Sequence, residues 1–170
     1  MRVRDGKIGA AVLCLCLCLC LCLCLLGCGA GREGPGALFD AFRASYHDLP
    51  AGRLYRSGAA EWEETAMPPS LIRRMYTEES GENAFSLCRE YAVYLCGGTG
   101  GGEVAFLRCA TRADAVRVCR MGEERIALVR RVCPDAAIVQ GACVLRYGCD
   151  VVILLLPDND RARGICDRLF

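Results

Sequence analysis

The chain has 170 residues, a formal net charge of +1 and a single histidine. That length suits one domain, and so balanced a charge excludes the strong electrostatic attraction by which basic domains bind nucleic acid. The first 27 residues hold the only lysine and a long uncharged stretch, so they differ sharply from the remainder. The two parts are therefore expected to have different roles.

The N-terminus has the pattern of a secretory signal. Three basic residues among the first seven precede an uncharged apolar stretch over residues 8–26. A basic start, an apolar stretch and a small residue before a cleavage point are typical of a signal peptide. The ending Leu25-Leu26-Gly27-Cys28 resembles the bacterial lipobox. That resemblance implies removal of residues 1–27, lipid attachment to Cys28 and anchoring at the extracytoplasmic face of the cell membrane.

An uncleaved transmembrane anchor is the alternative, because an uncharged stretch of this length can just span a bilayer. Its basic N-terminus would lie on the cytosolic side, so both alternatives place the domain outside the cytoplasm. The alternating Leu-Cys pattern suggests soft-metal binding, but low-complexity apolar filler explains it better. Glycine-rich residues 28–36 are expected to be a flexible tether, and residues 37–170 a single domain.

The domain begins with short elements. Residues 37–46 have helical spacing of apolar side chains, and residues 53–56 suit a short strand. Ser70 is the expected N-cap of a helix over residues 71–76. Two apolar runs, residues 91–96 and 103–109, are joined by glycine-rich residues 97–102 and predict a hairpin.

Longer elements follow. Residues 111–132 are predicted to form an amphipathic helix, because a continuous apolar stripe runs along them through Gly122 and ends at Cys133, the next residue. A second hairpin is expected over residues 137–146 and 150–156, and Asp158 is expected to cap a last helix. These elements predict an α+β fold: an antiparallel sheet of about four to five strands with helices packed on one face. The order also fits a ββα-ββα repeat, or two units that obey the same packing rules.

A resemblance follows from these elements. The features that carry it are Asp48-Leu-Pro, the strands Tyr91-Ala-Val-Tyr94 and Glu103-Val-Ala-Phe106, Arg125-Ile126 in the long helix, and the apolar strand after Gly148. With them, the chain from about Leu38 to Phe170 resembles a family of uncharacterised bacterial lipoproteins common in Gram-positive anaerobes. The resemblance implies a lipid-anchored extracytoplasmic domain and supplies no catalytic residue.

Two sequence features superficially suggest catalysis. His47 has Ser45 and Asp48 as neighbours, but the members of a catalytic triad converge from separate elements. The loop over residues 97–102 has the composition of a phosphate-binding loop, but neither a lysine nor a helix follows it. We therefore expect a solvated histidine and a hairpin loop, and we predict no catalytic residue, metal or cofactor.

The cysteines after Cys28 number eight and form no Cys-x-x-Cys motif, so no zinc or thioredoxin-like site is indicated. Most fall on apolar stripes or strands and are expected to be reduced core residues. An exported domain can also form disulfides, and Cys143 with Cys149 is the best candidate pair.

The acidic residues could do glycoside chemistry or bind calcium, but solvated loop charge is the simpler interpretation. They are Glu61, Glu63, Glu64, Glu78, Glu79 and Glu82. Trp62, the only tryptophan, is the first choice of binding contact if it is exposed. We expect a non-enzymatic binding or accessory domain that recognises a protein or a small molecule. The alternatives are a cell-envelope hydrolase, which needs a cleft around His47 or the glutamates, and a thiol-redox protein, which needs two close, exposed cysteines.

Overall fold

An open antiparallel sheet of five strands organises the residues that the computed structural model describes, which are 33–77, 81–97 and 101–170. The strand order is β1-β2-β3-β5-β4. The strands are β1 Gly52–Arg56, β2 Cys88–Cys96, β3 Glu103–Cys109, β4 Cys143–Tyr147 and β5 Asp150–Leu155. The predicted α+β class and antiparallel sheet are confirmed, as are both hairpins, β2-β3 and β4-β5.

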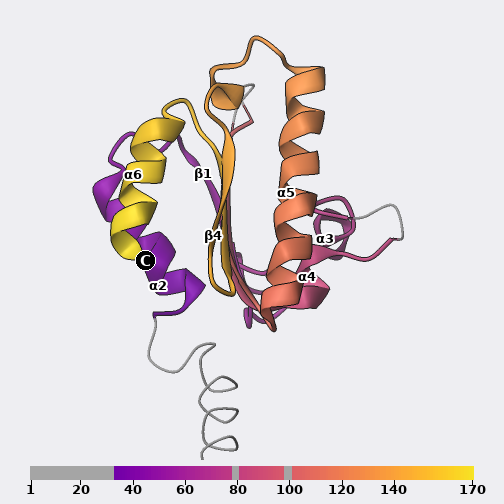
Figure 1. Ribbon diagram of the computed structural model, residues 1–170. Helices are drawn as coiled ribbons and strands as arrows, with labels where there is room; N and C mark the ends of the chain where they lie inside the picture. The colour runs from indigo at the N-terminus through magenta and orange to yellow at the C-terminus, as the bar shows by residue number, and fades with distance from the viewer. Residues whose placement is uncertain (1–32, 78–80, 98–100) are drawn as a thin grey trace, which may run out of the picture. The chain divides into compact units, whose positions relative to one another are not determined.

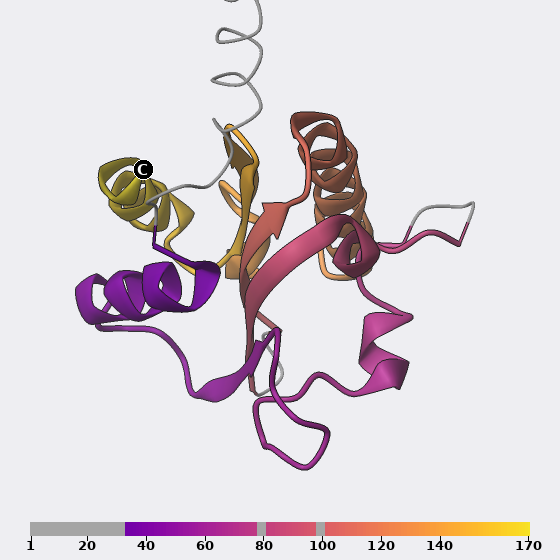
Figure 2. The same cartoon turned by 90° about the horizontal axis from the view of Figure 1, so that it is seen from below.

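Helices cover both faces of this sheet (Figure 1). The described helices are α2 Pro35–Ser45, α3 Pro69–Ile72, α4 Ala84–Leu87, α5 Arg112–Val132 and α6 Asn159–Leu169, with a 3₁₀ turn η1 at Ala137–Val139. The view in Figure 2 separates α2 and α6 on one side from α3, α4 and α5 on the other. The prediction that helices pack on one face is therefore wrong.

The reason lies in the two central strands, which are apolar on both sides. Along β5, Val151 and Ile153 belong to the core beneath α5, whereas Val152 and Leu154 belong to the core beneath α2 and α6. Strand side chains alternate between faces, so a strand that is apolar at every position needs cover on both. β3 follows the same rule, since Phe106 faces one core and its neighbour Leu107 the other.

The long helix α5 begins and packs largely as its sequence predicts. The Thr111 side chain caps it by accepting a hydrogen bond from the Asp114 N–H at 3.1 Å. Gly122 is buried and brings the helix close to the sheet, because a Cβ placed there would lie 2.9 Å from Ile153 Cδ1. Cys133 departs from the predicted stripe, since it follows the last turn and is exposed.

Other boundaries differ from the sequence predictions for local reasons. α2 begins at Pro35 rather than at residue 37, because proline suits the first helical position. The helix predicted from residue 71 begins at Pro69, with Pro68 rather than Ser70 at its N-cap. The strand expected over residues 137–146 is shorter, since η1 and a left-handed Gly141 precede β4.

A ββα-ββα repeat is not shown. The chain order β2-β3-α5 and β4-β5-α6 fits such a repeat. The helices α5 and α6, however, lie on opposite faces of the sheet (Figure 1). The sequence similarity between the two halves therefore does not extend to the face of the sheet that each helix covers.

Candidate functional site

Trp62 is the most exposed large apolar side chain among the described residues, at 88% of its full accessible surface. It lies in the loop over residues 57–66, which follows β1 and projects away from the sheet (Figure 2). Three exposed glutamates, Glu61, Glu63 and Glu64, are its close sequence neighbours. The loop therefore presents one large aromatic ring within a negatively charged setting.

Hydrogen bonds and buried anchors hold this loop in shape. The Arg56 N–H donates to the Thr65 carbonyl at 2.9 Å and closes the base of the loop. The Glu63 N–H donates to the Ala60 carbonyl at 2.8 Å, which forms a turn around Trp62. Beyond the loop, Met67 is buried in the core on the α5 side of the sheet. The Trp62 ring is thus presented on an internally bonded loop.

The base of the same loop is joined to β2. The Ser57 N–H donates to the Tyr91 carbonyl at 3.0 Å, and the Tyr91 N–H donates to the Ser57 hydroxyl at 2.9 Å. This reciprocal pair extends the contact between β1 and β2 by one residue. It fixes the direction in which the loop leaves the sheet.

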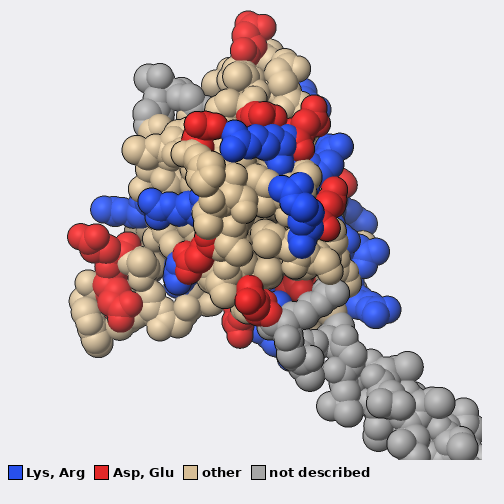
Figure 3. All heavy atoms as spheres, turned by 90° about the vertical axis from the view of Figure 1, so that its left-hand side faces the viewer, with Lys and Arg blue, Asp and Glu red and all other residues tan. Residues whose placement is uncertain are grey.

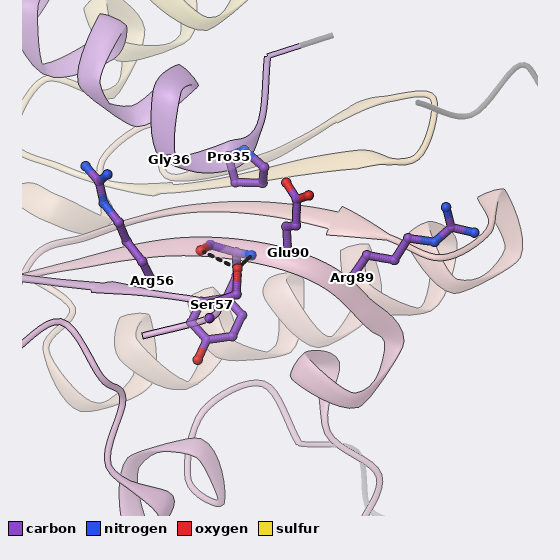
Figure 4. Close-up of a pocket in the computed structure, with 8 residues that line it drawn as sticks. Pro35, Gly36, Arg56, Ser57, Arg89 and Glu90 are labelled. Atoms are coloured by element: carbon purple, nitrogen blue, oxygen red, sulfur yellow. Dashed lines mark hydrogen bonds between the residues drawn. The ribbon is translucent and has the colours of Figure 1, made fainter. Parts of the chain in front are cut away.

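A cavity of about 350 Å³ lies beside the loop base. Its lining comprises Pro35, Gly36, Arg56, Ser57, Gly58, Arg89, Glu90 and Tyr91. Arg56 and Arg89 extend in opposite directions from it, whereas Glu90 points toward Pro35 (Figure 4). The Arg56 guanidinium also donates to Asp40 at 2.6 Å. The two cationic groups therefore do not converge on one ligand position.

The residues around His47 do not converge either. His47 is exposed, and the Ser45 hydroxyl donates to the Ala41 carbonyl at 3.2 Å within its own helix. Asp48 instead pairs with Arg161 at 2.6 Å. Neither His47 nor the loop glutamates line the cavity, so the cleft that the hydrolase alternative requires is not formed there.

The proposed Cys143–Cys149 disulfide is wrong, because Cys143 is a free thiol. Cys143 opens β4 opposite Leu154, whereas Cys149 lies in the turn that follows Tyr147. Four strand residues of about 3.3 Å each separate Cys143 from Tyr147. Because Cys149 lies beyond Tyr147, next to the Tyr147–Asp150 pair at the far end of the hairpin, it is farther from Cys143 than the ~7 Å between Cα atoms beyond which a disulfide cannot form.

Sequence reasoning missed a buried carboxylate, Glu103, at the start of β3, which is only 1% exposed. Its Oε1 accepts a hydrogen bond from the Tyr76 hydroxyl. Its Oε2 accepts two from Arg125, at 3.2 Å from Nε and 3.1 Å from the terminal nitrogen. Burial, and then the charge of Glu103, raise the pKa of Tyr76 well above its usual range. The carboxylate is thus fully paired and joins three separate parts of the chain.

A second missed pair is formed by Cys88 and Cys109, whose sulfur atoms lie 3.9 Å apart. Cys88 is half-buried and Cys109 is 2% exposed. The redox alternative required two cysteines that are close and exposed, and this pair is close but only partly exposed. The even cysteine count was the available signal, but it could not identify the partners.

Some of the predicted features fall on residues that the structure does not describe, and two kinds of site are absent from the residues that it does describe. Cys28, the signal segment, Glu78, Glu79 and residues 98–100 lie outside the described ranges. Within residues 33–77, 81–97 and 101–170, no helix is both long and apolar enough to span a membrane. No group of three or more His, Cys, Asp or Glu in the same ranges could hold a metal ion.

Comparison of the chain with protein-family models, curated proteins and solved structures found no match. The resemblance to uncharacterised bacterial lipoproteins therefore stays a prediction.

Proposed function

We propose that this chain is an exported lipoprotein, anchored through lipid on Cys28, whose domain is a non-enzymatic binding module. Its binding contact is Trp62, and its partner is a protein segment rich in arginine or lysine. The observation that carries the binding proposal is the 88% exposure of Trp62 on a hydrogen-bonded loop. The anchor proposal is supported by the basic, apolar and Gly27-Cys28 pattern of the N-terminus.

Trp62 suits a binding role because tryptophan is enriched among residues that dominate interface energetics. Its ring offers a large apolar surface and an indole N–H donor. A loop that is already internally bonded loses less conformational entropy on binding than a flexible one. The exposed ring is thus prepared for a partner at a small ordering cost.

The partner chemistry follows from the neighbouring charges. Glu61, Glu63 and Glu64 are exposed and attract cations, and a tryptophan face is the best aromatic surface for an arginine or lysine cation. Elsewhere, Figure 3 shows basic and acidic side chains interspersed on the side that carries α2 and α6. A basic segment therefore complements the Trp62 loop better than it complements that mixed surface.

Intrinsic fluorescence tests this proposal directly, because Trp62 is the only tryptophan. We expect an arginine-rich peptide to change the emission of the full chain in detergent, and a glutamate-rich peptide of equal length to leave it unchanged. Binding should weaken as salt rises, since exposed charges are screened over about 8 Å at physiological ionic strength. Equal responses to the two peptides would contradict the proposed partner class.

A variant series identifies the contact. By anisotropy of a labelled arginine-rich peptide, Trp62→Ala should raise Kd by about 30-fold, which corresponds to a hot-spot loss of about 2 kcal/mol. Leu128→Ala, at an exposed apolar position of α5 that is 48% accessible, is the matched control and should leave Kd unchanged. If both variants bind as the parent does, the Trp62 loop is not the binding site.

A further inference from the structure

Cys88 and Cys109 lie opposite each other on the neighbouring strands β2 and β3, at the end of this hairpin remote from its loop. Cys88 begins β2, Cys109 ends β3, and the two are direct partners in the strand register. Their sulfur atoms are 3.9 Å apart. Both belong to, or pack against, the core on the α5 side of the sheet.

The backbone around this pair has the geometry that a cross-strand disulfide requires. The Ala110 N–H donates to the Leu87 carbonyl at 3.0 Å, so the hydrogen bond joins the flanking residues. Cys109 donates its own N–H toward the other neighbouring strand, to the Cys149 carbonyl at 2.9 Å. Cys88 and Cys109 are therefore a non-hydrogen-bonded pair, whose Cα atoms in antiparallel sheets lie about 4.5 Å apart. Disulfides span Cα separations from about 4.4 Å to 6.8 Å.

From this geometry we propose that Cys88 and Cys109 form a redox modification site, which closes to an intradomain disulfide when a small disulfide oxidant is present. The inference is independent of the Trp62 proposal, since neither cysteine belongs to that loop. It also differs from the pairing that the sequence suggested.

The reaction is a two-step thiol–disulfide exchange. The half-buried Cys88, as its thiolate, attacks one sulfur of the oxidant and displaces the first small thiolate, which leaves a mixed disulfide on Cys88. Cys109 then attacks Cys88 Sγ, the new bond forms, and the second small thiolate leaves. Two protons pass from the protein thiols to the two leaving thiolates. The cysteine pair is oxidised by two electrons and the small disulfide is reduced to two thiols.

The order of attack follows from the accessibility of the two thiols. Cys109 is 2% exposed and is shielded from an oxidant in solution. Its hydrogen bond to Cys88 and its burial raise the pKa of its thiol above the usual range. Cys88, the more accessible thiol, therefore makes the first contact with the oxidant, and Cys109 is the resolving thiol, which gives up its proton only as it attacks Cys88.

Peptide mapping of the full chain tests this site. The chain is treated with oxidised glutathione at about pH 8, near the ordinary cysteine pKa. The remaining thiols are then alkylated, and the protein is digested with trypsin. Cleavage at arginine places Cys88 in residues 75–89 and Cys109 in residues 109–112. We expect these two peptides as one linked species, lighter by two hydrogens than their sum, which a reductant separates.

Two variants and a melting experiment complete the test. Cys88→Ala should abolish the linked species, whereas Cys96→Ala, at another half-buried thiol, should retain it. The oxidised parent should melt about 5–10 °C above the reduced parent, because the bond closes a loop of about twenty residues. Alkylation of both cysteines after oxidation, glutathione retained on Cys88, or linkage of either peptide to another cysteine would overturn the proposal.

Discussion

The buried carboxylate of Glu103 depends on its neighbours for both a balancing cation and a hydrogen-bond donor. It is 1% exposed and is paired with Arg125 and Tyr76. Removing the cation leaves a buried charge with only the tyrosine hydroxyl, so Arg125→Ala should lower the free energy of unfolding by about 3–5 kcal/mol. Chemical denaturation at neutral pH measures this loss.

The control for that prediction is Asp40→Ala, which removes an ion pair of which both side chains are substantially exposed, Arg56 at 37% and Asp40 at 58%. Exposed pairs contribute about 0–1 kcal/mol, so this variant should unfold nearly as the parent does. Equal losses in the two variants would show that burial does not determine the contribution of the Glu103 pair.

The sequence could not reveal the burial of Glu103, because a glutamate beside a glycine-rich loop is typical of an exposed strand end. Its partners come from distant places. Arg125 lies in the middle of α5, and Tyr76 reaches the carboxylate from a left-handed backbone conformation with φ of 51°. Only Gly adopts that conformation readily, so nothing local to Tyr76 predicts it. The sequence also left the exposure of Trp62 open, and only the structure places this ring in solvent.

Among the elements, α5 and α6 each contain a glycine, and their surroundings predict opposite responses to alanine. At Gly164 in α6 the nearest atom to an added Cβ is 3.8 Å away, so Gly164→Ala should raise the free energy of unfolding by about 0.5–1 kcal/mol. At Gly122 in α5 the added Cβ would lie 2.9 Å from Ile153 and 3.0 Å from Val144. Gly122→Ala should therefore give no gain, since crowding offsets the helix preference.

Thermal melts of the two alanine variants beside the parent measure the difference. A gain at Gly122 as large as that at Gly164 would mean that α5 does not approach the sheet as closely as the structure indicates. Because the substitution is the same at both sites, a difference in stability between the two variants measures packing against the sheet and not helix propensity.

Periodicity predicted α5, α6 and both hairpins, because their apolar side chains repeat over many residues. Strand pairing at the Cys88 end could not be predicted in the same way. The regular register of the hairpin, in which Tyr91 is opposite Leu107, would place Cys88 opposite Ala110 if continued. A register shift between Cys88 and Glu90 places it opposite Cys109 instead. Such a bulge inserts one residue into one strand and leaves no periodic signal.

For the molecule as a whole, the anchor is tested by intact mass of protein extracted from the membrane of an expressing bacterium. We expect a chain that begins at Cys28 and carries added lipid. Cys28→Ser should remain full-length and unacylated, whereas Cys133→Ser, at an exposed domain cysteine, should be processed as the parent is. A full-length, unacylated parent would favour the transmembrane anchor instead.

The α+β class could be predicted from the sequence, but the arrangement of helices on the two faces of the sheet could not. The apolar run of β5 required cover on both faces, whereas no periodic signal assigns α2 and α6 to one face and α5 to the other. Function is harder to predict at this scale, because the charge balance of +1 excludes partners without selecting one. The proposed partner class therefore comes from one loop rather than from the molecule as a whole.

The two edge strands of the open sheet also affect how copies of the domain interact with one another. Both edge strands, β1 and β4, are only five residues long, and each carries arginine, at positions 53 and 56 of β1 and position 146 of β4. Short, charged edges resist the strand-to-strand association through which open sheets aggregate. If the proposed lipid anchor confines copies to a membrane plane, those copies would meet far more often than copies in free solution. The brevity and charge of these edges would allow such copies to collide without joining into fibres.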